Sequence, residues 1–117
     1  SAGGHLAALL CGSELPYPEA EEEDLSHVSF RPDVCVLCYP LISLHSSLYG
    51  PGLEVCRNRL KLSEAEEEFL AADLRVARQH PPTFLWHTRN DNVVPVLQAE
   101  TYAESLKEAG VAHESYF

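Results

Sequence analysis

The apolar residues of this chain follow two patterns. Short continuous apolar runs, such as 34–39 and 83–87, are typical of buried strands in a parallel sheet. Longer stretches with apolar residues on one side, such as 96–109, are typical of amphipathic helices. The resulting order is helix, strand, helix, strand, helix, strand. This order predicts an α/β fold of about three strands, with right-handed crossovers and a parallel sheet carrying helices on both faces.

The same pattern predicts the boundaries of eight segments within one partial domain, 1–117. They are a helix over 1–12, an acidic loop over 13–32, a strand over 33–39, a variable helical segment over 49–79, a strand over 82–87, a loop over 88–95, a helix over 96–109 and a strand over 111–117. Within the variable segment, Ser63 and Glu66 form a capping box, which predicts a helix from Glu64 to about Arg78.

Composition narrows the function classes. The 117 residues include 18 acidic and 8 basic side chains, which gives a formal net charge of −10. Such a charge argues against nucleic acid and anionic membrane surfaces as partners, because both require basic patches. No apolar run is long enough to span a bilayer, and no cofactor motif is found. The compartment and the oligomeric state stay open.

The four cysteines include a C-x-x-C pair, Cys35 and Cys38. Both lie in a predicted strand, where side chains three residues apart point to opposite faces. A redox pair belongs at the start of a helix, and a zinc pair needs a turn. We therefore interpret these cysteines as small buried apolar residues and expect no metal site.

The first residues carry the strongest candidate chemistry. Ser1-Ala2-Gly3-Gly4 matches the second half of the G-x-S-x-G turn, in which a serine sits on a sharp corner between a strand and a helix. The residues after the serine must be small, because strand, turn and helix meet there. Ser1 is therefore a candidate nucleophile. Since the first half of the motif is absent, we interpret Ser1 as an internal position of a longer protein and the chain as a fragment.

A candidate acid follows the second predicted strand. In open α/β sheets, sites form outside the carboxyl ends of the strands, where loop 88–95 is expected. A serine hydroxyl needs a base, and a carboxylate holds that base in register. Asp91 has the right residue type and comes after Ser1, as the acid does in hydrolases of this fold. The alternative is a turn aspartate, because Asn90-Asp91-Asn92 is also good turn chemistry.

Together, the segments 1–7, 32–40 and 81–95 resemble α/β-hydrolase esterases of the acetyl-xylan-esterase-like or carboxylesterase-like type. The resemblance implies that Ser1 is the nucleophile, that Asp91 is the triad acid and that the backbone N–H of Ala2 is one oxyanion donor. It places the second donor in a loop upstream of this chain. The triad histidine would follow the strand over 111–117, and so would lie beyond this sequence.

The six histidines have other expected roles. His5 lies one helical turn from Ser1; a supporting role is favoured over that of the base, because a helix start disfavours the protonated imidazole. His87 ends a strand beside the acid loop and is expected to line the site. His113 enters the last strand. The other three are expected at loops or helix ends, in contact with solvent: His27, His45 and His80.

The main functional hypothesis is a fragment of a serine carboxylic-ester hydrolase, with a small-molecule or carbohydrate-linked ester as substrate and with little activity by itself. One alternative is an N-terminal-nucleophile hydrolase, in which the α-amine of Ser1 is the base; a strand starting at Ser1 would favour it. The other alternative is a non-catalytic binding domain of the hydrolase fold. An apolar sheet edge and face left uncovered would make the fragment marginally stable.

Overall fold

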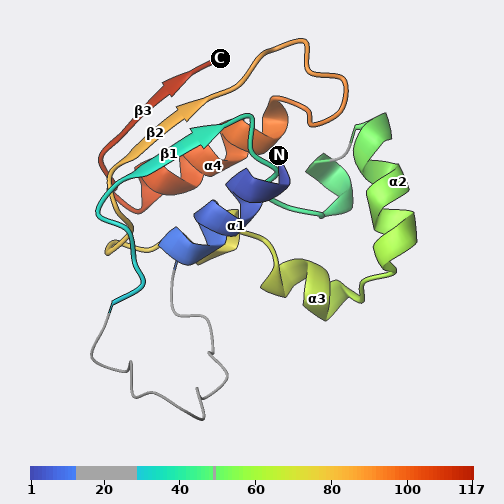
Figure 1. The fold of residues 1–117 in the computed structure, drawn as a ribbon, viewed down its shortest axis with the longest axis horizontal. Coiled ribbons are helices and arrows are strands. Elements are labelled where there is room, and N and C mark those ends of the chain that lie inside the picture. Colours follow the sequence, from blue (N-terminus) through green and yellow to red (C-terminus); the bar gives the residue numbers. More distant parts are fainter. Residues whose placement is uncertain (13–28, 49) are drawn as a thin grey trace.

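The structure, a computed structural model, describes residues 1–12, 29–48 and 50–117, so most of the predicted acidic loop lies outside the described residues. Its elements, in chain order, are α1 (Ala2–Cys11), β1 (Cys35–Cys38), the 3-10 helix η1 (Ser46–Leu48), α2 (Pro51–Leu60), α3 (Glu64–Phe69), the 3-10 helix η2 (Asp73–Arg75), β2 (Thr83–Trp86), α4 (Leu97–Glu108) and β3 (His113–Tyr116). Figure 1 shows this arrangement.

The three strands form one parallel sheet in the order β1-β2-β3. In register, Cys35 lies beside Thr83, and Thr83 lies beside His113. The α/β class expected from the alternation of elements is confirmed. All three strands therefore end at the same edge of the sheet, which is where loops following them can meet.

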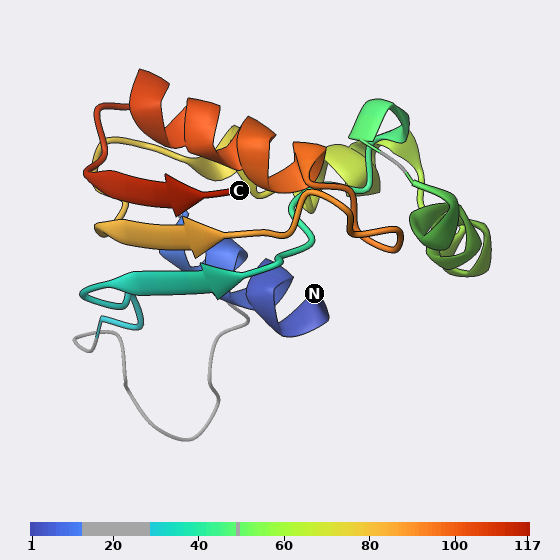
Figure 2. The same ribbon diagram turned by 90° about the horizontal axis from the view of Figure 1, so that it is seen from above.

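The sheet is covered on one face within the described residues. Leu37 and Leu85 point into the core, whereas Val36 and Phe84 point to the opposite face, and Val36 is 64% exposed. Both α1 and α4 pack on the face of Leu37 (Figure 1). The prediction of helices on both faces is thus not met here. The connection from β1 to β2 carries α2 and α3 to one end of the sheet instead of across its open face (Figure 2).

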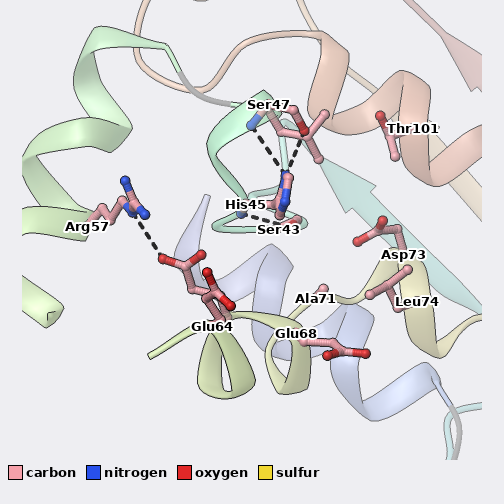
Figure 3. A pocket seen from close by; sticks show the side chains of 12 residues that line it. Ser43, His45, Ser47, Arg57, Glu64, Glu68, Ala71, Asp73, Leu74 and Thr101 are labelled. Carbon is pink, nitrogen blue, oxygen red and sulfur yellow. Dashed lines mark hydrogen bonds and ion pairs between the residues drawn. The ribbon is translucent and has the colours of Figure 1, made fainter. Parts of the chain in front are cut away.

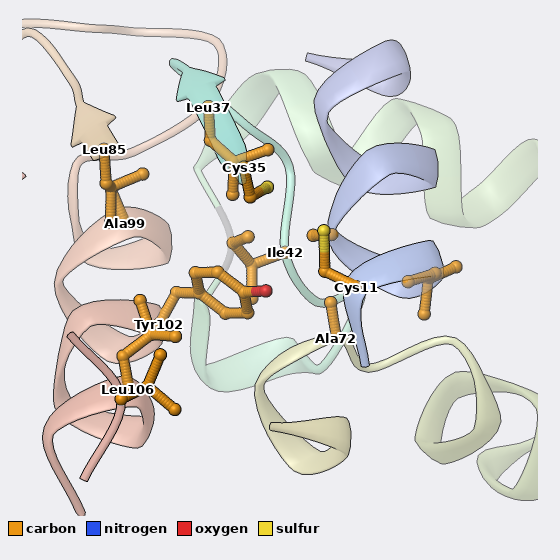
Figure 4. Packing of buried hydrophobic residues seen from close by; sticks show 12 residues of the cluster. Cys11, Cys35, Leu37, Ile42, Ala72, Leu85, Ala99, Tyr102 and Leu106 are labelled. Carbon is orange, nitrogen blue, oxygen red and sulfur yellow. The ribbon is translucent and has the colours of Figure 1, made fainter. Parts of the chain in front are cut away.

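The core lies between this covered face and the two helices. Figure 4 shows Tyr102 of α4 reaching toward Ile42, with Cys11 of α1 and Cys35 of β1 close by. Cys35 and Cys38 lie on opposite faces of the strand as expected, and both are free thiols. Cys35 is buried but Cys38 is partly exposed, because it faces the uncovered side of the sheet, so the interpretation as a buried residue holds for Cys35 alone. Within the described ranges, no group of three acidic, histidine or cysteine side chains is arranged to hold a metal ion.

The prediction of a helix from Glu64 to about Arg78 was wrong at its C-terminal end, because α3 is shorter. Its start is as expected, with both hydrogen bonds of the capping box between Ser63 and Glu66. It ends at Phe69, and the N–H of Ala72 then donates to the carbonyl of Ile42 at 2.9 Å. The chain leaves the helix because burial of this stretch against the core outweighs its local helix preference.

His80 was expected in solvent but is 5% exposed. Its Nδ1–H donates to the carbonyl of Pro81 at 2.8 Å, and its Nε2 accepts from the hydroxyl of Tyr102 at 2.7 Å. Burial, more than any other cause, lowers the pKa of His80. The prediction was wrong because a hydrophilic side chain with partners for both ring nitrogens can be buried at little cost.

A search of the described helices finds none with the length and apolar character needed to cross a bilayer.

Candidate active site

Ser1 lies at the carboxyl edge of the sheet, at the start of α1. Its carbonyl accepts hydrogen bonds from the N–H of His5 at 3.0 Å and from the N–H of Leu41 at 3.2 Å. Leu41 follows the end of β1 by three residues, so this bond fixes the helix start beside the strand end. The Ser1 side chain is exposed and does not cap α1. Helix capping therefore does not engage its hydroxyl.

Gly4 explains how α1 can begin so close to β1. A Cβ atom at position 4 would lie 2.9 Å from Cβ and 3.0 Å from Cα of Pro40, closer than such atoms approach one another. A Cβ atom at Gly3 would meet nothing within 4 Å among the described residues. Among the described residues, packing therefore requires a small residue at position 4 and leaves position 3 free of close contacts.

Ala2 is the first residue of α1, and it is exposed. The first N–H groups of a helix have no acceptor within the helix, and the helix dipole makes this end partly positive. An oxyanion beside Ser1 would meet this end of α1. The backbone N–H of Ala2 thus has the chemistry needed to bind developing negative charge.

Asp91 lies in the loop that follows β2, at the same edge of the sheet as Ser1. Its Oδ1 accepts from the N–H of Val93 at 2.8 Å and from the N–H of Val94 at 2.9 Å. These two bonds, that of Val94 first, lower the pKa of Asp91. The carboxyl is therefore ionised at neutral pH, and its side chain keeps 21% of its surface exposed.

His87 lies beneath this loop and is 2% exposed. Its Nε2–H donates to the carbonyl of Val94 at 2.8 Å, and the same nitrogen is 3.5 Å from Oδ2 of Asp91. The other ring nitrogen, Nδ1, is buried without a hydrogen-bond partner in the described structure. His87 thus supports the loop from inside and does not line an open site, which differs from the prediction.

A sequence signal for this burial exists. Side chains alternate between the two faces of a strand, so Thr83, Leu85 and His87 share one face. Thr83 and Leu85 are both buried, and His87 continues their face past the end of β2. The period of two along this strand therefore predicts an inward-pointing histidine.

His5 extends toward the end of α3. Its Nε2–H donates to the carbonyl of Leu70, the residue that follows α3, at 2.7 Å. This bond occupies one ring nitrogen in holding α1 against the end of α3. The geometry is that of a supporting residue, the role favoured from the sequence.

The start of α2 packs against the acid loop. A Cβ atom at Gly52 would lie 3.0 Å from Cα of Val93, and one at Gly50 would lie 2.7 Å from Cγ of Pro95. Both glycines therefore allow a close approach between α2 and the loop that carries Asp91.

The structure brings Ser1 and Asp91 to one edge of the sheet but does not join them by a hydrogen bond. Within the described residues, no histidine bonds to the side chain of Ser1, and His87 is the histidine that approaches Asp91. His27 lies outside the described residues.

A cavity of about 660 Å³ lies elsewhere, between η1, α2, α3 and α4 (Figure 3). Arg57 pairs there with Glu67 at 3.0 Å, and burial raises the pKa of Asp73. Its lining residues are Ser43, His45, Ser47, Leu48, Arg57, Glu64, Glu67, Glu68, Ala71, Asp73, Leu74 and Thr101. Neither Ser1 nor Asp91 is among them.

Comparison with known proteins gives the class of the fold. No model of a protein family matches the chain. Its structure is similar to the acetyl ester-xyloside bifunctional hydrolase from Caldicellulosiruptor lactoaceticus, with 37% identity and a TM-score of 0.80, covering 98% of this chain and 42% of that one. It is also similar to the propionate-bound esterase 2 from Thermogutta terrifontis, with 31% identity and a TM-score of 0.69, covering 97% and 40%.

The chain therefore has the fold of part of an α/β-hydrolase, and the resemblance to acetyl-xylan-esterase-like and carboxylesterase-like proteins is confirmed. A curated relative is endo-1,4-β-xylanase B of Butyrivibrio fibrisolvens, 28% identical over 121 residues, which cover 99% of this chain and 18% of the xylanase. The chain thus spans less than half the length of both solved structures and under a fifth of this relative.

Proposed function

We propose that this chain carries the nucleophile and the acid of a serine ester hydrolase. The Ser1 Oγ attacks the carbonyl carbon of a carboxylic ester while a base takes its proton. The tetrahedral intermediate collapses to an acyl-serine, the alcohol leaves with a proton, and water then releases the acid by the same route. Asp91 orients the base, and the Ala2 N–H binds the oxyanion.

The observation that carries this proposal is that a serine hydroxyl and a carboxylate lie at the same edge of the sheet. An exposed serine hydroxyl begins α1, and an ionised carboxylate follows β2 at the same edge of the sheet. The Ser1 hydroxyl does not cap its helix, and Oδ2 of Asp91 has a 3.5 Å contact with His87, whereas Oδ1 accepts the two backbone hydrogen bonds. Both arrangements suit a triad.

The base in this proposal is the histidine that the family resemblance places after the strand over 111–117. His87 does not suit the role, because a nitrogen that receives a serine proton must reach the serine, and this ring is buried beneath the acid loop. His5 has its Nε2–H directed to Leu70. We therefore expect the 117 residues by themselves to have little or no esterase activity.

Small or carbohydrate-linked carboxylic esters are the proposed substrates. This class rests on similarity to a protein named as an acetyl ester-xyloside hydrolase and to one named as a xylanase. The N-terminal-nucleophile alternative gains no support, because it called for a strand at Ser1 and α1 begins at Ala2. The non-catalytic binding domain is an outcome of the test below.

The test treats the full natural polypeptide that carries this chain with a fluorophosphonate probe. Phosphorus bonds to an activated serine oxygen and fluoride leaves. We expect the label on Ser1, its loss in Ser1→Ala, and its retention in Ser47→Ala, which removes another exposed serine.

Asp91→Asn should lower the turnover of p-nitrophenyl acetate about 10³- to 10⁴-fold. Labelling of another serine, or hydrolysis that survives Ser1→Ala, would reject the proposal; an unlabelled protein that binds esters would favour the binding domain.

A further inference from the structure

We infer that His87 is a positioning residue for Asp91, which it holds in place by clamping the loop through the backbone of Val94. The catalytic meaning of this inference rests on the proposed function. The clamp itself rests on contacts that exist whether or not the chain is an enzyme.

Val94 is held from both of its peptide groups. Its N–H donates to Oδ1 of Asp91 at 2.9 Å, and its carbonyl accepts from Nε2–H of His87 at 2.8 Å. The same His87 nitrogen lies 3.5 Å from Oδ2 of Asp91. The carboxylate, the peptide and the imidazole thus close a ring of contacts at the base of the loop, and Val94 is 3% exposed at its centre.

The position of the ring proton follows from these partners. A backbone carbonyl can only accept a hydrogen bond, so the nitrogen that faces Val94 must carry hydrogen. His87 is therefore the Nε2–H tautomer. In the other tautomer a lone pair of Nε2 would face the carbonyl of Val94 and the carboxylate of Asp91, and the clamp would be lost.

The clamp has a consequence for the direction of Asp91. The side chain turns with the loop backbone, because Oδ1 is held by two N–H groups of that loop. If the carbonyl of Val94 lost its donor, the 94–95 peptide could rotate. The backbone torsions of Val94 would then be free to change, and the 93–94 peptide could turn the N–H of Val94 away from Oδ1. The carboxylate would then lose both its fixed direction and the main cause of its lowered pKa.

Two substitutions separate this role from simple filling of space. In His87→Gln, the amide nitrogen of Gln can occupy the place of Nε2 and donate to Val94. In His87→Asn, the shorter side chain places its amide nearer to the position of Nδ1 and cannot reach. Both variants keep a neutral polar group at a buried site, but Asn is smaller by one methylene. His87→Met, which matches Gln in volume but has no donor, is therefore the control and should behave like His87→Asn if the hydrogen bond is what matters.

The first experiment is NMR spectroscopy of the full natural polypeptide labelled with ¹⁵N and ¹³C. In the unmodified protein, the ring ¹⁵N shifts of His87 should show the Nε2–H tautomer. In His87→Gln, the pKa of Asp91 should stay lowered, and amide exchange at Val94 should stay within threefold of the unmodified protein. In His87→Asn, the pKa of Asp91 should rise toward its ordinary value, and amide exchange at Val94 should be at least tenfold faster.

Two results would overturn the inference. One is an Nδ1–H tautomer in the unmodified protein, a measurement that needs no variant and so stands even if His87→Asn fails to fold. The other is equal behaviour of the Gln and Asn variants at Asp91 and Val94.

The second experiment measures ester hydrolysis by the full natural polypeptide. A positioning role predicts that His87→Asn lowers kcat at least tenfold with KM changed less than twofold, and that His87→Gln restores most of kcat. A loss confined to KM, or equal kcat in both variants, would overturn the role. If the fluorophosphonate probe fails to label Ser1 while the NMR differences appear, the proposed function fails and the clamp stands. If the probe labels Ser1 but the Gln and Asn variants give the same NMR result, the clamp fails and the proposed function stands.

Discussion

The side-chain amide of Gln98 pairs with the backbone of Ser43 in both directions. Its Oε1 accepts from the N–H of Ser43 at 2.8 Å, and its Nε2–H donates to the carbonyl of Ser43 at 2.8 Å. The same amide also accepts from Ile42 at 2.9 Å and donates to Leu48 at 3.0 Å. Gln98 is fully buried, so α4 holds the loop after β1 by a polar contact with no solvent competition.

Replacing this amide should be costly. Gln98→Leu would leave several buried backbone groups of the loop without partners, and we expect a loss of about 2–4 kcal/mol in the free energy of unfolding. Gln79→Leu is the matched control, because Gln79 is exposed, and it should change this free energy by less than about 0.5 kcal/mol. Urea denaturation measures both; equal effects of the two substitutions would mean that the Gln98 bonds contribute little.

Gly3 and Gly4 form a second matched pair. Gly4→Ala should destabilise the protein by about 1–3 kcal/mol, because the new Cβ would lie 2.9 Å from Cβ of Pro40. Gly3→Ala meets open space in the described structure, and should stabilise by up to about 1 kcal/mol, since alanine is the better helix former. Thermal unfolding measures both variants, and the change in stability should be negative for Gly4→Ala and positive for Gly3→Ala. A gain for Gly4→Ala would show that α1 is free to move away from Pro40.

The lowered pKa of Asp91 predicts how stability depends on pH. A carboxyl whose folded pKa lies below its unfolded value stabilises the protein above the unfolded value, about 3.9, and this contribution is lost as pH falls through the folded pKa. We expect Asp91→Asn to remove this part of the acid dependence, because Asn keeps an acceptor for Val93 and Val94 but does not titrate. Asp33→Asn, at an exposed position, is the control and should leave the acid limb unchanged. Denaturation at several pH values below 5 is the measurement.

His80 predicts a dependence at higher pH. Its folded pKa is lowered by burial, so the unfolded chain binds the proton more tightly, and stability falls as pH drops below the unfolded value of about 6.5. We expect the free energy of unfolding of the unmodified protein to decrease from pH 7 to pH 5, and His80→Gln to flatten this slope. His45→Gln, at an exposed histidine, should not flatten it. An unchanged slope in His80→Gln would show that His80 is not the titrating group.

Local signals in the sequence were sufficient for the element order and the parallel sheet. The apolar run of β1 and the capping box at Ser63 each depend on neighbours along the chain, and both led to the observed element. The end of α3 could not be found in this way, because it is set by a hydrogen bond between Ala72 and Ile42, thirty residues apart. The face of Val36 is likewise uncovered because α2 and α3 lie at one end of the sheet, and local periodicity does not encode where these helices pack.

The placement of the candidate site also followed from topology. Parallel strands end at one edge, so a serine at the start of α1 and an aspartate after β2 were expected to share that edge, where the structure has them. Their catalytic roles stay predictions. The contact of His87 with Val94 was missed, since the residue type suggested solvent or substrate, and only the period-two position past Leu85 indicates burial.

The excursion over 51–70 touches both candidate catalytic elements. It begins where Gly52 packs against Val93 of the acid loop, and it ends where the carbonyl of Leu70 accepts from His5 of α1. It therefore connects the two segments that carry the proposed nucleophile and the proposed acid. A substitution far out on α2 that tilts this helix would change the spacing of Ser1 and Asp91 while leaving both side chains intact. If the proposed function holds, mutations remote from both residues would therefore change turnover.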